Sequence, residues 1–231
     1  MQLFGPIHLA LLTAIVAVAV LLAWLCRARP AAARFVRIGL GAGLAVNELI
    51  WWTFRYSHEG FRFPLNLPLQ LCDMTLWAAV IACLTLAPVV LEFAYFAGIA
   101  GAGMALLTPD LWTPWPSYPA VYFFFVHGGI VAAPIILVGG QIVRLRDGAV
   151  WRAYGILFVY AVCLGGFNAA FHTNYMYLCA RPANASPLDS FGAWPRYLFV
   201  TAVVALGLFW LLWLPVRHSA AARRPDVQLG A

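Results

Sequence analysis

The run PIHLALLTAIVAVAVLLAWLC, residues 6–26, decides the fold class of this chain. It contains 21 residues and no Asp, Glu, Lys or Arg. A helix of this length, rising about 1.5 Å per residue, crosses the roughly 30 Å hydrocarbon core of a bilayer. No positive charge precedes the run, whereas Arg27, Arg29 and Arg34 follow it, which is the reverse of a cleaved secretory signal. We therefore interpret the run as the first membrane-spanning helix.

The remainder of the 231-residue chain has a similar composition. Hydrophobic residues make up 64% and charged residues 10% of the chain, against about one charged residue in four in soluble domains. With a mean hydropathy of +0.86, this composition excludes an ordinary soluble domain. It predicts an all-α polytopic membrane protein with seven transmembrane helices. The predicted spans are residues 6–26, 35–55, 67–87, 89–107, 118–140, 151–176 and 195–215.

The arginines predict the orientation of these spans. Ten of the fourteen lie at one end of the spans and four at the other, and cytoplasmic loops are the ones enriched in positive charge. We therefore expect the N-terminus outside and the C-terminus in the cytoplasm, with residues 1–216 forming a single transmembrane domain and residues 217–231 a disordered tail. The net charge of +6 is then a topology signal, and we expect no nucleic-acid partner. The larger set is Arg27, Arg29, Arg34, Arg37, Arg144, Arg146, Arg152, Arg217, Arg223 and Arg224, and the smaller is Arg55, Arg62, Arg181 and Arg196.

Polar side chains within the predicted spans gather at the outer end. A charged side chain at the bilayer centre costs at least about 2.5–3.5 kcal/mol, so such residues face a protein interior and usually mark function. Their common depth predicts a polar cavity that opens to the outer leaflet. Glu92, near the cytoplasmic start of the fourth span, is the exception. The outer group comprises His8, Asn47, Glu48, Gln70, Cys72, Asp73, His127, Asn168, His172 and Asn174.

Each of these residues also has a structural interpretation. An intramembrane His or Asn often forms an interhelical hydrogen bond worth roughly 0.6–2 kcal/mol. Glu48 has Arg55 seven residues further along the same helical face, so the two could form an ion pair, with Trp51 and Trp52 in an aromatic belt. The five cysteines show no metal-binding spacing, and their odd number precludes a fully paired disulfide set.

Cys72 differs from the other cysteines in its surroundings. In LPLQLCDM, residues 67–74, Pro68 is a natural first helical residue, which puts Cys72 about one turn into the helix. Free backbone N–H groups there help a thiolate or hold an oxyanion, although the neighbouring Asp73 opposes the thiolate. His127 and His172 are candidate bases at a compatible depth, and Asn168 stands four residues before His172, where it could orient the ring.

Five segments resemble the bacterial YwaF-like integral membrane proteins, which belong with the transmembrane protein 164 family. They are LPLQLCDM, FAGIAGAGMALLTPDLW, FFFVHGG, HTNYMYLCARP and SPLDSFGAWPRY. The eukaryotic members have seven spans and are described as acyltransferases that place polyunsaturated chains on ether phospholipids through a cysteine acyl-enzyme. The resemblance implies that Cys72 is this cysteine, that His127 matches the histidine of FFFVHGG, and that the chain lies in the bacterial inner membrane. Because most bacteria lack such lipids, the substrate does not transfer.

Residues and resemblance together predict an enzyme, a membrane-embedded acyltransferase acting on phospholipid or a related lipid, with its site toward the outer leaflet. We expect a membrane lipid as substrate, neither cofactor nor metal, and an oligomeric state that the sequence leaves open. NYMYLCARP carries tyrosines and an arginine suited to a phosphate headgroup. The predicted catalytic residues are Cys72, His127, His172 and Asn168, and the predicted substrate-binding residues are Glu48, Gln70, Asp73, Asn174, Tyr175 and Arg181.

Two alternatives belong to other functional classes. In a haem or metal protein, His127 and His172 would ligate haem, or would bind zinc together with Asp73 or Glu48. In a transporter or ligand-binding seven-helix protein, the outer cavity would bind its ligand without covalent chemistry. Transport is the weaker alternative, because the inner halves of the spans are nearly free of polar residues apart from Glu92.

The arginine distribution makes the topology testable. We expect a C-terminal alkaline phosphatase fusion to be inactive and a C-terminal fluorescent-protein fusion to be bright in bacterial cells, because the tail stays in the cytoplasm. An active phosphatase fusion paired with a dark fluorescent one would reverse the orientation and move the polar group to the other leaflet.

Overall fold

The computed structural model describes residues 1–111, 113–182 and 186–217, and within them the chain forms helices and no strands. Most of the predicted tail lies outside the described residues. The elements are α1 (Pro6–Ala28), α2 (Pro30–Glu59), α3 (Leu71–Thr85), α4 (Pro88–Phe93), the π-helix η1 (Ala94–Gly98), α5 (Ile99–Leu107), α6 (Tyr118–Gly139), α7 (Ala149–Phe171), the 3₁₀ helices η2 (Tyr175–Tyr177) and η3 (Pro187–Phe191), and α8 (Arg196–Trp213).

A helical segment occurs at each of the seven predicted ranges, with α4, η1 and α5 forming one rod over residues 88–107. Five segments are long and apolar enough to cross a membrane: α1, the rod, α6, α7 and α8. The chain is thus an all-helical integral membrane protein, whereas the count of seven spans and their orientation stay predictions. The sixth predicted range, residues 151–176, is too long, because α7 ends at Phe171, where His172 adopts a left-handed backbone conformation (φ 53°, ψ 40°).

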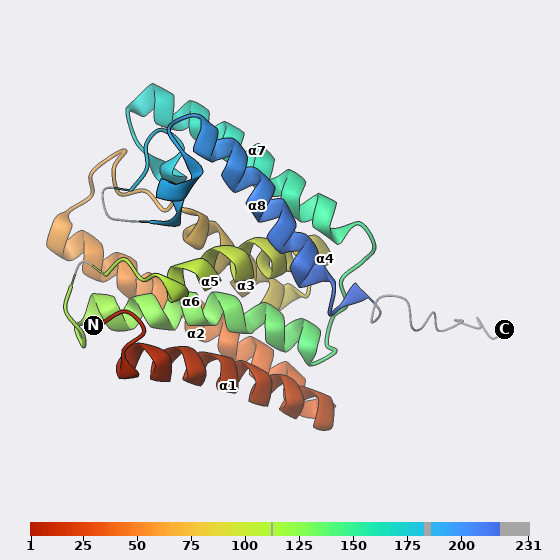
Figure 1. Ribbon diagram of the computed structural model, residues 1–231. Helices are drawn as coiled ribbons and strands as arrows, with labels where there is room; N and C mark the ends of the chain where they lie inside the picture. Colours follow the sequence, from red (N-terminus) through yellow and green to blue (C-terminus); the bar gives the residue numbers. More distant parts are fainter. Residues whose placement is uncertain (112, 183–185, 218–231) are drawn as a thin grey trace.

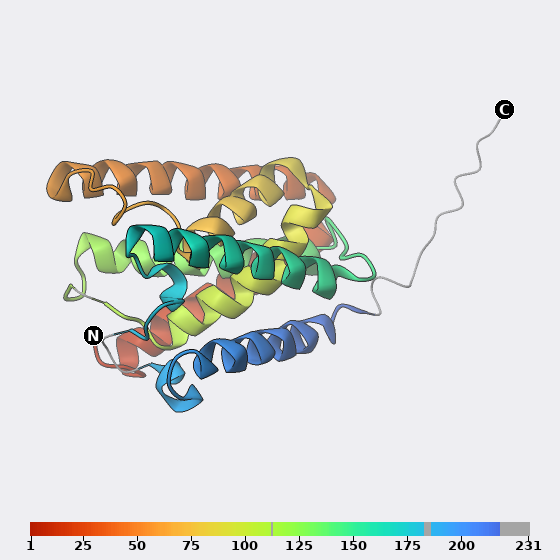
Figure 2. The same ribbon diagram turned by 90° about the horizontal axis from the view of Figure 1, so that it is seen from above.

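The helices run back and forth between two ends of a bundle (Figure 1). One end, which we call the N-terminal end, holds the N-terminus, the start of α6 and the end of α7; α3 begins further inside the bundle, and α8 ends toward the opposite end. α3 and α6 run in the same general direction (Figure 2). α6 packs against α1, α2, α3 and α5, while α7 and α8 pack against the α4–η1–α5 rod, so α6 and the rod form the middle of the bundle.

Two adjacent glycines let α6 approach two neighbours closely. A Cβ atom added at Gly128 would lie 2.9 Å from Ile15 Cγ1 of α1, and one added at Gly129 would overlap Leu44 Cδ2 of α2. Leu44 is 1% exposed, so its side chain has little room to move. Small residues at such positions are typical of helix pairs in membranes, because van der Waals packing drives their association.

An ion-pair cluster closes the opposite end of the bundle. Glu92 of α4 is 1% exposed and accepts hydrogen bonds from Arg146 Nε at 2.9 Å and Arg152 Nε at 2.8 Å. Each arginine also donates a second bond to the same carboxylate. Glu92, which lies apart from the outer polar group, therefore joins α4 to α7 and to the loop before α7. The two arginines neutralise its buried charge.

The close approach at Gly129 predicts the effect of a larger side chain. Gly129→Val should lower the unfolding free energy by about 1–3 kcal/mol, because the new methyl groups overpack a buried contact. Gly155→Val on α7 is the matched control, since a Cβ atom there meets nothing within 4 Å. The measurement is the thermal unfolding midpoint in detergent, and equal midpoints for the two variants would contradict the packing described here.

Candidate functional site

Cys72 is the second residue of α3, closer to the start of the helix than the sequence predicts. The helix begins at Leu71 and not near Pro68, because Asp73 Oδ2 accepts a hydrogen bond from Gln70 N at 2.8 Å and caps the first turn. In the same capping box, the Gln70 side chain accepts a hydrogen bond from the Asp73 backbone N–H. The thiol therefore lies in the first turn of a capped helix, the region where a helix leaves backbone N–H groups without partners within the helix.

The surroundings of Cys72 are apolar on one side and polar on the other. Its side chain packs against an apolar cluster that includes Leu76 of α3 and Phe123 of α6. Its neighbour in the chain, Asp73, is polar and turns its carboxylate back to the backbone of Gln70. Cys72 itself is half-buried, whereas Cys26 and Cys83 are buried and Cys163 and Cys179 are exposed. The Cys72 side chain is therefore packed on one side and still partly accessible.

His127 lies within α6 and is 8% exposed. Its ring stacks on Phe123, with 4.1 Å between the ring centroids, and its Nδ1 lies 2.8 Å from the Phe123 carbonyl oxygen. Because a carbonyl oxygen only accepts hydrogen bonds, Nδ1 must carry the proton in this contact, and Nε2 keeps its lone pair. The ring is therefore held in the tautomer that a general base requires.

The register of α3 against α6 relates Cys72 to His127. Gly98 of η1 lies between the two helices: a Cβ atom there would be 3.0 Å from Ile130 Cγ2 and 3.6 Å from Thr75 Cβ. Thr75 and Ile130 are therefore at the same level of the bundle. Cys72 precedes Thr75 by three residues, and His127 precedes Ile130 by three. Since α3 and α6 run in the same general direction (Figure 2), Cys72 and His127 each lie about one turn from this contact, toward the starts of their helices.

Glu48 is fully buried and joins α2 to α6. Its Oε2 accepts a hydrogen bond from the Tyr122 hydroxyl at 2.5 Å, and its Oε1 accepts one from Trp52 Nε1 at 2.7 Å. Trp51 stacks on the Tyr122 ring with centroids 4.1 Å apart. The suggested pair between Glu48 and Arg55 is wrong, because Arg55 instead binds Glu59 at 3.1 Å on the exposed end of α2. Sequence reasoning missed Tyr122. The feature that could have revealed it is a hydroxyl-bearing residue directly before a run of three Phe residues, five residues before His127.

Asn168 and His172 do not form the expected contact. The Asn168 side chain is buried, and its oxygen accepts hydrogen bonds from Thr173 Oγ1 at 2.7 Å and Tyr175 N at 3.0 Å. Its nitrogen donates to the Tyr175 carbonyl at 2.9 Å. The left-handed conformation at His172 ends the helix, so His172 leaves the helical position above Asn168 and is exposed. Asn168 therefore organises the chain after α7.

Four predicted binding residues hold the loops at the N-terminal end. Asn174 Oδ1 accepts hydrogen bonds from Cys179 N and Ala180 N. Arg181 forms an ion pair with Asp189 at 3.4 Å, with both side chains partly exposed. Gln70 Oε1 accepts a bond from the backbone of the segment after α7, and the Tyr175 hydroxyl binds the segment before α3. Their role toward a substrate stays a prediction.

His8 and Asn47, the remaining members of the outer group, differ in their contacts. His8 is fully buried; its Nδ1 accepts a hydrogen bond from Phe4 N at 3.0 Å, and its Nε2 donates to the Leu106 carbonyl at 2.8 Å. It thereby joins the start of α1 to the end of α5. Asn47 buries its side-chain nitrogen without a hydrogen-bond partner among the described residues. Within those residues, no group of three or more His, Cys, Asp or Glu side chains is arranged to hold a metal ion.

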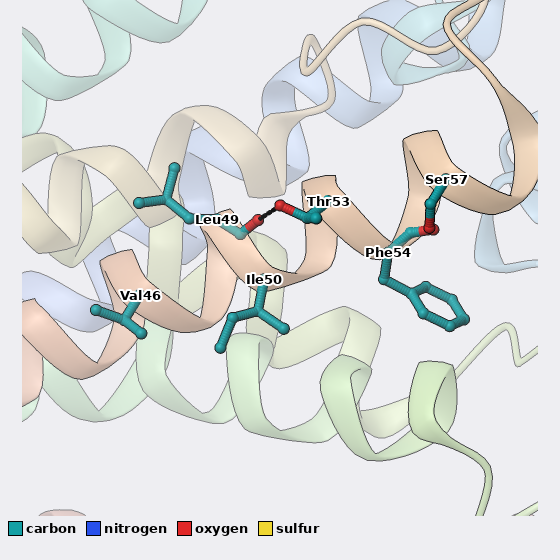
Figure 3. A pocket seen from close by; sticks show the side chains of 6 residues that line it. All are labelled: Val46, Leu49, Ile50, Thr53, Phe54 and Ser57. Atoms are coloured by element: carbon teal, nitrogen blue, oxygen red, sulfur yellow. Dashed lines mark hydrogen bonds between the residues drawn. The ribbon is translucent and has the colours of Figure 1, made fainter.

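The surface grooves of α2 do not contain the predicted site residues. One groove is lined by residues spaced three or four apart on one face of α2 (Figure 3). Its Thr53 and Ser57 hydroxyls donate to the carbonyls of Leu49 and Phe54, which leaves the groove apolar, as a lipid-facing surface requires. A second groove lies near the start of α2. The first is lined by Val46, Leu49, Ile50, Thr53, Phe54 and Ser57, and the second by Arg34, Phe35, Ile38 and Gly39.

Comparison with known proteins identifies one relationship. The model of the TMEM164 family matches residues 3–213, which is most of the described chain. No curated protein and no solved structure matches the sequence.

Because Glu48 is buried, removal of one of its hydrogen-bond donors should destabilise the protein. Tyr122→Phe should lower the unfolding free energy by about 1–3 kcal/mol, because a fully buried carboxylate loses one of its two donors. Tyr118→Phe is the control: Tyr118 lies one turn earlier, is 36% exposed, and would keep its ring contact with Phe54. The thermal unfolding midpoint in detergent measures both. A Tyr122→Phe midpoint at the level of the control would show that Glu48 does not need this bond.

Proposed function

This chain belongs to the TMEM164 family, and on that premise we propose that it is a membrane-embedded acyltransferase that carries acyl chains on Cys72. The substrate would be a phospholipid or related lipid. The observation that carries the proposal is the environment of Cys72: a half-buried thiol in the first turn of a capped helix, packed against the apolar cluster that contains Phe123, on whose ring His127 stacks.

In the first half-reaction, Cys72 Sγ attacks the carbonyl carbon of a lipid ester while His127 Nε2 takes the thiol proton. The carbonyl oxygen becomes an oxyanion, which backbone N–H groups in the first turn of α3 stabilise. The bond from the carbonyl carbon to the glycerol oxygen then breaks. The leaving oxygen takes the proton from His127, which gives a lysolipid and a thioester on Cys72.

In the second half-reaction, a hydroxyl of an acceptor lipid attacks the thioester, and His127 Nε2 takes the hydroxyl proton. The carbon–sulfur bond breaks, the acyl chain moves to the acceptor oxygen, and the proton returns to the Cys72 sulfur. No redox step occurs, and the enzyme regains its starting state. His127 thus serves as acid and base in turn, which a neutral imidazole can do near physiological pH.

The location of the site bears on the substrate. We propose that the seven helical segments all span the bacterial inner membrane with the N-terminal end outside, which puts Cys72 in the outer leaflet. His172 and Arg181 are then candidates for headgroup contacts, since His172 is exposed and the Arg181 side chain keeps 40% of its surface exposed. Glu48 and Asp73 are the proposed acidic groups of the same site.

The proposal predicts a covalent intermediate. Purified protein incubated with labelled phospholipid or acyl-thioester should form a hydroxylamine-sensitive adduct on Cys72, and Cys72→Ser should form none. Cys163→Ser, which changes an exposed cysteine of α7, should label like the wild type. His127→Gln should slow adduct formation by about 10²–10⁴-fold, because the thiol then lacks its base. Full lipid remodelling by Cys72→Ser, or an adduct on another cysteine, would overturn the mechanism.

A further inference from the structure

The segment that precedes Cys72 is held by hydrogen bonds from a distant part of the chain. We call residues 60–70 the strap; it connects α2 to α3. Asn66 folds the strap internally, because its Oδ1 accepts a hydrogen bond from Arg62 N at 2.9 Å and its Nδ2 donates to the Gly60 carbonyl at 2.8 Å. Asn66 is 4% exposed, so these bonds are shielded from solvent. The strap is an ordered element.

Two tyrosines bind the strap from the side of α7. The Tyr175 hydroxyl donates to the Pro64 carbonyl at 2.6 Å and accepts a bond from Leu67 N at 2.9 Å. The Tyr160 hydroxyl donates to the Leu69 carbonyl at 2.9 Å. Tyr175 is 5% exposed and takes no part in the proposed chemistry. Leu67 and Leu69, the last two strap residues that these tyrosines bind, lie five and three residues before Cys72.

These contacts form a continuous path to Cys72. Asn168 fixes the backbone of Tyr175 with two hydrogen bonds, Tyr175 fixes the strap, and the strap leads into the first turn of α3. Met176 N adds a bond at 3.0 Å to Gln70 Oε1, at the residue that caps α3.

We propose that Tyr160 and Tyr175 are positioning residues that hold the strap and thereby fix Cys72 and limit access to its sulfur. The inference rests on the proposed function, because it gives the strap a role in acyl transfer. It reassigns Tyr175, since both bonds of its hydroxyl are made to the strap and none is left for a headgroup. Small displacements of a nucleophile reduce turnover strongly, because attack requires a narrow geometry.

Single Tyr→Phe changes test this role. Tyr160→Phe and Tyr175→Phe should each lower kcat for lipid remodelling by roughly tenfold while KM changes less than about twofold, because positioning acts on the reacting thiol and not on binding. Tyr154→Phe is the matched control: Tyr154 also lies on α7, and its hydroxyl donates to a carbonyl, that of Ala202 in α8 at 3.1 Å. This control removes a similar bond away from the strap and should keep its kcat.

A second measurement does not depend on catalysis. In protein carrying Cys163→Ser and Cys179→Ser, a maleimide should alkylate Cys72 about threefold faster after Tyr160→Phe or Tyr175→Phe than after Tyr154→Phe. If Cys72→Ser keeps activity while the alkylation difference holds, the acyl-enzyme fails but the control of access by the strap stands. Equal alkylation rates and equal kcat values in all three Tyr→Phe variants would overturn the positioning role. A raised KM in Tyr175→Phe alone would show instead that Tyr175 binds the lipid headgroup.

Discussion

The close approach of α6 to its neighbours is the constraint on which the rest of the bundle depends. Helices in lipid gain little from the hydrophobic effect between them, so their association relies on tight packing and a few polar contacts. Gly128 and Gly129 bring α1 and α2 against α6, and Gly98 brings η1 between α6 and α3. Because these contacts set the register of α3 against α6, the level of Cys72 relative to His127 follows from glycines that carry no chemistry.

Much of this arrangement is readable from the sequence, because lipid imposes length and apolarity on each segment. All seven predicted ranges contain helix. The partners of the polar groups were not readable, because they depend on tertiary contacts. Glu48 binds Tyr122 on another helix, and not Arg55 on its own helical face. The end of α7 depends on a single left-handed residue, His172, which periodicity does not reveal.

The same comparison explains why predicted binding residues turned out to have structural contacts. A polar side chain near the end of a span can bind either a ligand or the irregular backbone of a loop, whose N–H and C=O groups need partners in a low-dielectric region. Asn168 and Asn174 meet that need in the chain after α7. The sequence shows that such residues are polar at the correct depth, but their choice of partner depends on where the loop folds.

Cys72 lies where the two parts of the bundle meet. α1, α2 and α6 pack together on one side, and α7 and α8 pack on the other against the α4–η1–α5 rod. His127 belongs to the first part and Tyr160 to the second, while the strap bound by Tyr175 crosses between them. A thiol supported from both sides is aligned only while the two parts keep their relative position. The strap, which leads into the first turn of α3, is therefore tied to α7 and to the segment after it through the hydroxyls of Tyr160 and Tyr175.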